Sequence, residues 1–358
     1  MKKKSRVIIL ILAVLIIFFI AANIIVGSIA PRIVERQIEE NLKLKSSIGK
    51  ISLSLPFIIN IEKAEIGNLA RIKKISFAPS LISLLFGKIV IHGLNIVEPV
   101  VNLEQSPDGK MNLPALEQKQ KAPAIYLTSL RVVDGKIIFT DKKINPNGFQ
   151  TVINRLNIKI SKVVLPVTSL AADFNLTAQI ADSKMSSLGD IAFYGKLDYL
   201  SGNMDAKLEL KDLGLVNFSP YYGNFISNRK LASGSLNITS VFKSKNNDLK
   251  IMTVFNLIGL NYEKSLEEPQ AEQGFEFGLT SDALDMFTDQ QGNLRLEFEI
   301  DTKLNNPSLS PDKIKGIILK AAMKNLSGQS PEQIIDKVTS KIEKYKDIGK
   351  ELKNIFKN

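Results

Sequence analysis

Strict alternation of apolar and polar residues recurs along most of this chain and constrains its fold more than any other feature. The clearest example alternates arginine, glutamate and aspartate with four apolar residues: Leu294, Leu296, Phe298 and Ile300. Successive side chains of a β-strand point to opposite faces of a sheet, so this pattern predicts a strand with one apolar and one solvated face. Other segments with this period contain Ile51, Leu53, Ile59, Ile158, Ile160, Phe174, Leu176 and Leu208. The chain is therefore predicted to be mostly β, with few helices.

The stretch from Gly87 to Leu116 predicts two short strands separated by a break. Two apolar residues precede Gly93 with one parity and two follow it with the other: Ile89 and Ile91, then Leu94 and Ile96. The apolar face is therefore expected to switch near Gly93. A glycine inside a strand often marks a bulge or a bend, which would allow such a switch.

Residues typical of turns occur near the end of this stretch and again further along the chain. Val101 and Leu103 restore the period of two before the first turn. Two Asp-Gly pairs supply residues that accept a positive φ: Asp108 with Gly109, and Asp134 with Gly135. The second pair lies between two strand segments and predicts a hairpin.

The composition argues against an enzyme. The 358 residues include no cysteine, no tryptophan and a single histidine, His92. Thiolate chemistry is absent, and imidazole metal clusters and histidine-dependent triads are disfavoured. We therefore expect no catalytic residues, no metal site and no cofactor. The net charge of +11 suits an anionic membrane surface or nucleic acid.

The amino terminus favours the membrane. Basic residues at positions 2–6 precede an apolar run from Val7 to Val26, whose only clearly polar side chain is Asn23. Such a run spans about 30 Å as a helix, which matches the hydrocarbon core of a bilayer. The basic end should stay cytoplasmic, so the run is expected to anchor the chain in the inner membrane with its bulk in the periplasm. A cleaved signal peptide, with small residues at Ser28 and Ala30, is the alternative.

The rest of the chain divides by pattern. We expect a tip and transmembrane anchor over residues 1–30, a β unit over 31–116, a possible linker over 117–124, a main β domain over 125–310 and helices over 311–358. Short helical segments are predicted at Ser80–Phe86 and within residues 213–226. The last, amphipathic helix suits packing on the sheet, lying on anionic lipid, or pairing with a partner helix.

So many apolar strand faces must be buried within the protein or must bind an apolar ligand. A β-sandwich would bury them against a second sheet, and a barrel would enclose them. A long curled sheet would leave them as a trough for acyl chains. The strand pattern alone leaves these three architectures open.

The chain resembles the AsmA-like proteins of Gram-negative envelopes, a group that includes TamB-type and YhdP-type proteins. The resemblance is carried first by a glycine-, proline- and asparagine-containing signature at Gly93, Leu94, Pro99, Val101, Asn102, Leu103, Asp108, Gly109, Asn112 and Leu113. Val132–Gly135 with the strand after it, and the segment from Leu284 to Ser310, are also similar. The amino-terminal apolar helix fits the family, whereas many relatives are far longer.

The resemblance implies a long curled, mainly antiparallel sheet that forms an apolar groove or half-barrel, with a role in phospholipid transport and outer-membrane assembly. The apolar residues expected to line this groove are Ile51, Leu53, Ile59, Ile89, Ile91, Val101, Leu103, Ile158, Ile160, Phe174, Leu176, Leu208, Leu294, Leu296, Phe298 and Ile300. Its expected ligands are phospholipid acyl chains. The alternative is a non-catalytic scaffold with a closed β domain that binds other envelope proteins. Nucleic acid is not an expected partner.

Overall fold

The computed structural model describes residues 2–114, 124–165, 171–222, 229–264, 288–289, 291–307, 316–317 and 320–321. The side chains of residues 2–16, 18, 165, 222, 229, 230 and 264 are outside this description. Residues 117–123 of the linker predicted over 117–124 and most of the predicted carboxy-terminal helices are outside it as well.

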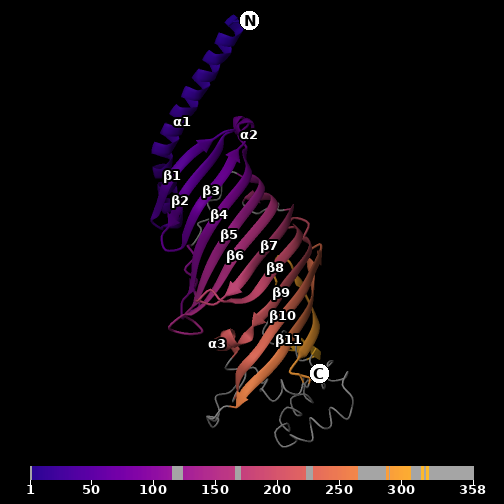
Figure 1. The fold of residues 1–358 in the computed structure, drawn as a ribbon. Helices are drawn as coiled ribbons and strands as arrows, with labels where there is room; N and C mark the ends of the chain where they lie inside the picture. The colour runs from indigo at the N-terminus through magenta and orange to yellow at the C-terminus, as the bar shows by residue number, and fades with distance from the viewer. Residues whose placement is uncertain are drawn as a thin grey trace, which may run out of the picture. The chain divides into compact units, whose positions relative to one another are not determined.

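Within the described residues, twelve strands form one sheet in which neighbours in sequence are neighbours in space (Figure 1). The strands are β1 (Ser46–Ser54), β2 (Ile58–Ile66), β3 (Ala70–Pro79), β4 (Ile89–Gln105), β5 (Ile125–Asp141), β6 (Phe149–Leu165), β7 (Ala171–Ala181), β8 (Ser187–Asp198), β9 (Asn203–Gly214), β10 (Arg229–Lys245), β11 (Asp248–Lys264) and β12 (Leu294–Lys303). The helices are α1 (Lys2–Leu42), α2 (Leu81–Leu85), the 3₁₀ turn η1 (Leu215–Phe218) and α3 (Ser219–Tyr222). The prediction of a mostly β chain with few, short helices between strands is confirmed.

The sheet is mixed but mainly antiparallel. β4 and β5 run parallel, while the neighbours from β1 to β4, from β5 to β7 and from β9 to β12 run antiparallel. The connection over residues 106–124 therefore returns the chain to the end of the sheet where β4 begins. β1 and β12 are the two ends of the strand order and do not pair with each other. The described strands thus form one open sheet, and neither a sandwich nor a closed barrel.

The chain divides into two compact units. Unit 1 comprises Met1–Ser186 and Tyr194–Leu200, and unit 2 comprises Ser187–Phe193 and Ser201–Asn358. The domain boundaries expected from the sequence stay predictions.

In unit 1, helix α1 packs along the outer strand β1. Val26, Ala30, Val34 and Ile38 contact a small core of buried residues: Ile48, Ile51 and Ala64. Polar side chains of α1 also bond the backbone of β1, because the Oε1 atom of Glu35 accepts from the N–H of Ile48 at 2.7 Å. The helix thus covers a strand edge that would otherwise expose unpaired backbone groups.

The stretch from Gly87 to Leu116 differs from the prediction of two short strands. Residues Ile89–Gln105 form a single strand, and Pro99 lies inside it. The predicted break is absent because the irregularity at Gly93 is absorbed as a bulge: the register against β3 shifts between Ser76 and Ala78. Gly93 itself has a φ of 61°.

The hairpin predicted at Asp134 and Gly135 is wrong. Both residues lie in the middle of the single strand β5, and the register against β6 shifts on either side of Gly135. Asp134 has a φ of 52°. Some bulges and the common two-residue hairpin turns both use a residue with positive φ, so an Asp-Gly pair is compatible with either structure.

The expected transmembrane anchor falls largely on side chains outside the description, namely those of Val7–Ile16 and Phe18. Among the described residues, no helix meets the length and hydropathy that a membrane span requires.

A candidate apolar binding face

A row of branched aliphatic residues crosses the strands of unit 1. The strand registers place one residue from each of seven consecutive strands side by side: Ile51, Ile61, Ile75, Ile96, Val132, Ile158 and Leu176. Cross-strand partners lie on the same face of a sheet. Ile51 is 3% exposed under α1, whereas the other members are partly exposed. The row therefore forms the centre of an apolar face that the described residues leave partly uncovered.

The bulge at Gly93 keeps this face apolar. Ile75 and Pro79 are four residues apart in β3 and share a face, while their partners Ile96 and Ile91 in β4 are five residues apart. One extra residue has thus been inserted in β4, and the N–H of Gly93 donates to Oγ1 of Thr128 at 3.3 Å. The expected switch of the apolar face does not occur. The extra residue reverses the alternation, so the apolar residues before Gly93 (Ile89 and Ile91) and those after it (Leu94 and Ile96) lie on the same face.

A second irregular position, further along the strands, also keeps apolar residues on this face. Leu176 and Ile180 are four residues apart in β7, but their partners Ile158 and Ile153 in β6 are five apart. The inserted residue is near Arg155, which has a φ of 49°. Neighbouring strands carry positive φ at the corresponding level, at Lys63, Glu98 and Asp134. The bulge in β6, aligned with these positive φ angles, therefore lets the apolar residues on both sides of it share one face although their sequence parity changes.

All the lining residues predicted in unit 1 lie on this face. Apart from those in the row, the registers and the strand alternation place there Leu53, Ile59, Ile89, Ile91, Val101, Leu103, Ile160 and Phe174. Their role as a lining stays a prediction. The row members Ile61, Ile75, Ile96 and Val132 were not among the predicted lining residues. The alternation around these residues is visible in the sequence, but their alignment across neighbouring strands depends on the pairing registers.

Unit 2 carries an apolar face of the same kind. Leu208 aligns through Ser240 and Thr253 with Phe298, and Leu294, Leu296 and Ile300 share the parity of Phe298 in β12. Two buried hydroxyls within this face, on Ser240 and Thr253, bond each other at 2.9 Å. The ring of Phe193 meets the ring of Phe242 edge-on at 5.7 Å. Mutual bonding of the hydroxyls lets them sit on an apolar surface at little cost.

Charged side chains of unit 2 occupy the opposite parity. Lys207 contacts Glu209 at 2.5 Å, and this hydrogen bond holds the pKa of the glutamate below its usual value. Glu299 accepts from Lys250 at 2.5 Å and raises the pKa of the lysine. The described ion pairs of unit 2 therefore lie on the face opposite the apolar one.

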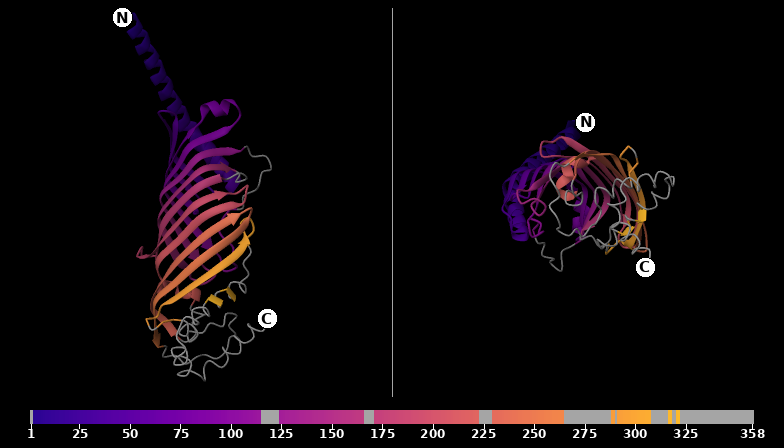
Figure 2. Two further views of the ribbon diagram at one scale, coloured as in Figure 1. Left: turned by 90° about the vertical axis from the view of Figure 1, so that its right-hand side faces the viewer. Right: turned by 90° about the horizontal axis from the view of Figure 1, so that it is seen from below.

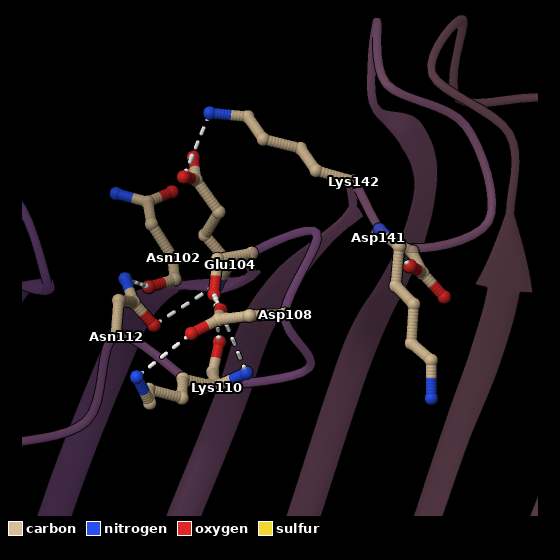
Figure 3. A network of polar contacts seen from close by, with 9 residues as sticks. Asn102, Glu104, Asp108, Lys110, Asn112, Asp141 and Lys142 are labelled. Atoms are coloured by element: carbon tan, nitrogen blue, oxygen red, sulfur yellow. Dashed lines mark hydrogen bonds and ion pairs between the residues drawn. The ribbon is translucent and has the colours of Figure 1, made fainter.

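A polar network at the carboxy-terminal end of β4 stabilises the Asp108–Gly109 turn (Figure 3). Asn112 acts as a clamp: its Oδ1 accepts from the N–H of Glu104 at 2.9 Å, and its Nδ2 donates to the carbonyl of Asn102 at 3.0 Å. Asp108 accepts from Lys110, at 2.8 Å, and from Ser106, and these bonds lower the pKa of its carboxyl. These asparagines and this Asp-Gly pair of the family-like signature therefore build a turn.

The described residues show no grouping suited to metal chemistry. No three side chains of histidine, aspartate or glutamate in the described ranges lie together as a metal site would require. His92 is an exposed residue of β4.

A scan against protein-family models finds no match to this chain, and a search of curated proteins finds none either. The resemblance to AsmA-like proteins thus rests on the sequence motifs.

Proposed function

We propose that this protein is anchored in the inner membrane and uses the apolar face of its sheet to shield phospholipid acyl chains in the periplasm. Its role would be phospholipid transport and outer-membrane assembly. The observation that supports the proposal is the row of aliphatic residues through seven strands, which the pairing registers place on one face. A face that served only as a closed core would need a second layer, and the described strands form a single open sheet.

The chemistry of the face suits an acyl chain. Each methylene removed from water contributes about 0.8 kcal/mol, without any directional contact. The sheet is proposed to curl around the chain as a groove, with the charged outer face in water. Because the described ion pairs of unit 2 lie on the opposite parity, little selectivity among headgroups is expected.

Helix α1 would supply the anchor. Its apolar run from Val7 matches a bilayer core in length, and the basic residues before it favour a cytoplasmic amino terminus. The proposed localisation rests on this charge and hydropathy pattern.

Two adjacent valines offer a matched test of the apolar face. Val132 belongs to the row, whereas Val133 pairs with Val97 on the opposite face. A photo-crosslinking amino acid is placed at one position or the other in the full chain, and the protein is irradiated in its native membranes. Mass spectrometry is expected to find a phospholipid adduct at position 132 and none at position 133.

The same pair of sites tests function. Val132→Asp places a carboxylate on the apolar face, where it is poorly solvated, and should reduce uptake of a fluorescent acyl probe several-fold. Val133→Asp should leave uptake near that of the parent protein. Protein-only adducts at position 132, together with equal uptake by both variants, would overturn the proposal in favour of a protein-binding scaffold.

A further inference from the structure

The turn between β1 and β2 and the short helix α2 carry a cluster of exposed large apolar side chains. Four of them are more than two-thirds exposed: Leu55 at 71%, Ile82 at 72%, Leu85 at 85% and Phe86 at 76%. Phe57, Leu81 and Leu84 are also exposed, at 48%, 48% and 46%. Together these residues are called the apolar tip. Isolated exposed apolar residues are common, but such a group marks an interaction surface.

The apolar tip lies at one end of unit 1. The β1–β2 turn follows Ser54, and the register of β2 with β3 brings this end of β1 next to the end of β3, where α2 begins. Helix α2 is fixed in place, because Ser80 caps its first turn and the N–H of Ser80 donates to the carbonyl of Val90 at 2.8 Å. The tip is therefore an ordered feature of the sheet end.

Helix α1 leaves the sheet at this same end (Figure 1; Figure 2, left). Oδ1 of Asn23 accepts from the N–H of Leu53 at 2.8 Å, whereas Glu39 bonds the N–H of Ser46 at the other end of β1. The helix thus runs antiparallel to β1, and the residues before Asn23 project beyond the β1–β2 turn. The apolar run and the apolar tip therefore extend from the same end of unit 1.

The sheet limits how much of α1 is available to hydrocarbon. From Asn23 onwards one side of the helix is committed to β1, because Val26 packs on the buried core. The 16 residues from Val7 to Ala22 would span about 24 Å, which is shorter than a hydrocarbon core of about 30 Å. A short span draws the bilayer surface toward the flanking protein. The bilayer surface would then lie at the level of Asn23, where the tip begins.

We infer that the apolar tip inserts into the surface of the bilayer that α1 crosses, so that the first strands of the sheet start at the lipid headgroups. This inference rests on the proposed membrane anchor. The segment from Leu81 to Phe86 contains no charge, and Lys88 follows it. An apolar segment with an adjacent cation suits the boundary between acyl chains and anionic headgroups. Acyl chains would thus meet the apolar face where the sheet touches the membrane.

The chain has no cysteine, so a single introduced cysteine can be labelled cleanly. Ile82→Cys probes the tip, and Ile144→Cys is the matched control in the β5–β6 turn at the opposite end of unit 1. Ile17→Cys reports on the apolar run itself. The full chain carrying one environment-sensitive fluorophore is reconstituted in vesicles of phosphatidylethanolamine and phosphatidylglycerol, with and without nitroxide-labelled lipid.

The expected result is a blue-shifted emission that nitroxide lipid quenches at positions 17 and 82, with neither effect at position 144. Quenching at position 17 without quenching at position 82 would overturn the insertion of the tip and leave the anchor intact. Absence of quenching at both positions would overturn the anchor and with it this inference. Equal quenching at positions 82 and 144 would show non-specific adsorption and would also overturn the inference.

Discussion

At the scale of single residues, positive φ angles decide which way the apolar side chains point. The N–H of a residue with positive φ is repeatedly bonded by a side chain next to it. Asp134 donates to Oδ1 of Asn157 at 3.2 Å, and Asp212 donates to Oδ1 of Asn237 at 2.5 Å. Both asparagines sit where the strand register shifts. These bonds satisfy a backbone group that the bulge removes from the ladder.

Gly93 gives a residue-scale prediction. A Cβ added there would meet only the Nδ2 atom of Asn95 at 3.9 Å, so space does not restrict the site. The φ of 61° restricts it instead. Gly93→Val should reduce the free energy of unfolding by at least about 1–2 kcal/mol, the usual penalty of a left-handed conformation. Chemical unfolding followed by circular dichroism measures the change.

Gly93→Asn is the control for this prediction, because asparagine tolerates the left-handed region better than other non-glycine residues. The asparagine variant should lose clearly less stability than the valine variant. Equal losses in the two variants would show that something other than the backbone conformation limits the site.

At the scale of elements, α1 performs a second task besides the proposed anchoring. Its side chains bond three backbone N–H groups of the edge strand β1: Asn23 bonds Leu53, Glu35 bonds Ile48 and Glu39 bonds Ser46. An exposed edge strand is a template for pairing with another chain. The helix therefore protects this edge through polar side chains, while its aliphatic residues pack on the core.

Glu35 and Glu40 provide an element-scale prediction with a matched control. Glu35→Ala leaves the N–H of Ile48 without its acceptor, and a loss of this kind costs about 1–3 kcal/mol. Hydrogen exchange in β1 should become faster. Glu40 bonds Arg36 within the helix at 2.7 Å, so Glu40→Ala should leave exchange in β1 unchanged. Faster exchange in both variants would indicate general loosening of α1.

At the scale of the whole molecule, the described strands form one sheet with an apolar face in each unit and no second sheet against it. Binding that depends on removing methylenes from water should follow acyl-chain length. Each added methylene is expected to tighten the binding of a single-chain lipid probe by up to about fourfold, as 0.8 kcal/mol implies.

A titration series with rising chain length and two different headgroups measures this dependence. Affinity should rise steadily with chain length and change little with the headgroup. An affinity that followed the headgroup and ignored the chain would contradict burial of the chain on the apolar face.

The sequence by itself determined the local structure. The period of two predicted strands such as Leu294–Lys303, and the break in alternation predicted α2. Residues with turn chemistry marked some positions of positive φ, such as Gly93 and Asp134, whereas Lys63, Glu98 and Arg155 carry no such signal. These features depend on a residue and its near neighbours, so a single chain displays them directly. The Asp-Gly signal at Asp134 marked a residue that does have a positive φ, but this residue lies inside the strand β5 and not in a hairpin turn.

Only the tertiary structure decided how those local pieces combine. The row that begins at Ile51 and ends at Leu176 depends on six strand registers between residues far apart in sequence. The parallel pairing of β4 with β5 and the docking of Asn23 on β1 are contacts of the same kind. Within an uninterrupted strand the alternation determines which side chains share a face. It does not determine where a bulge reverses that parity or which strand lies beside it, because any two apolar faces can pair.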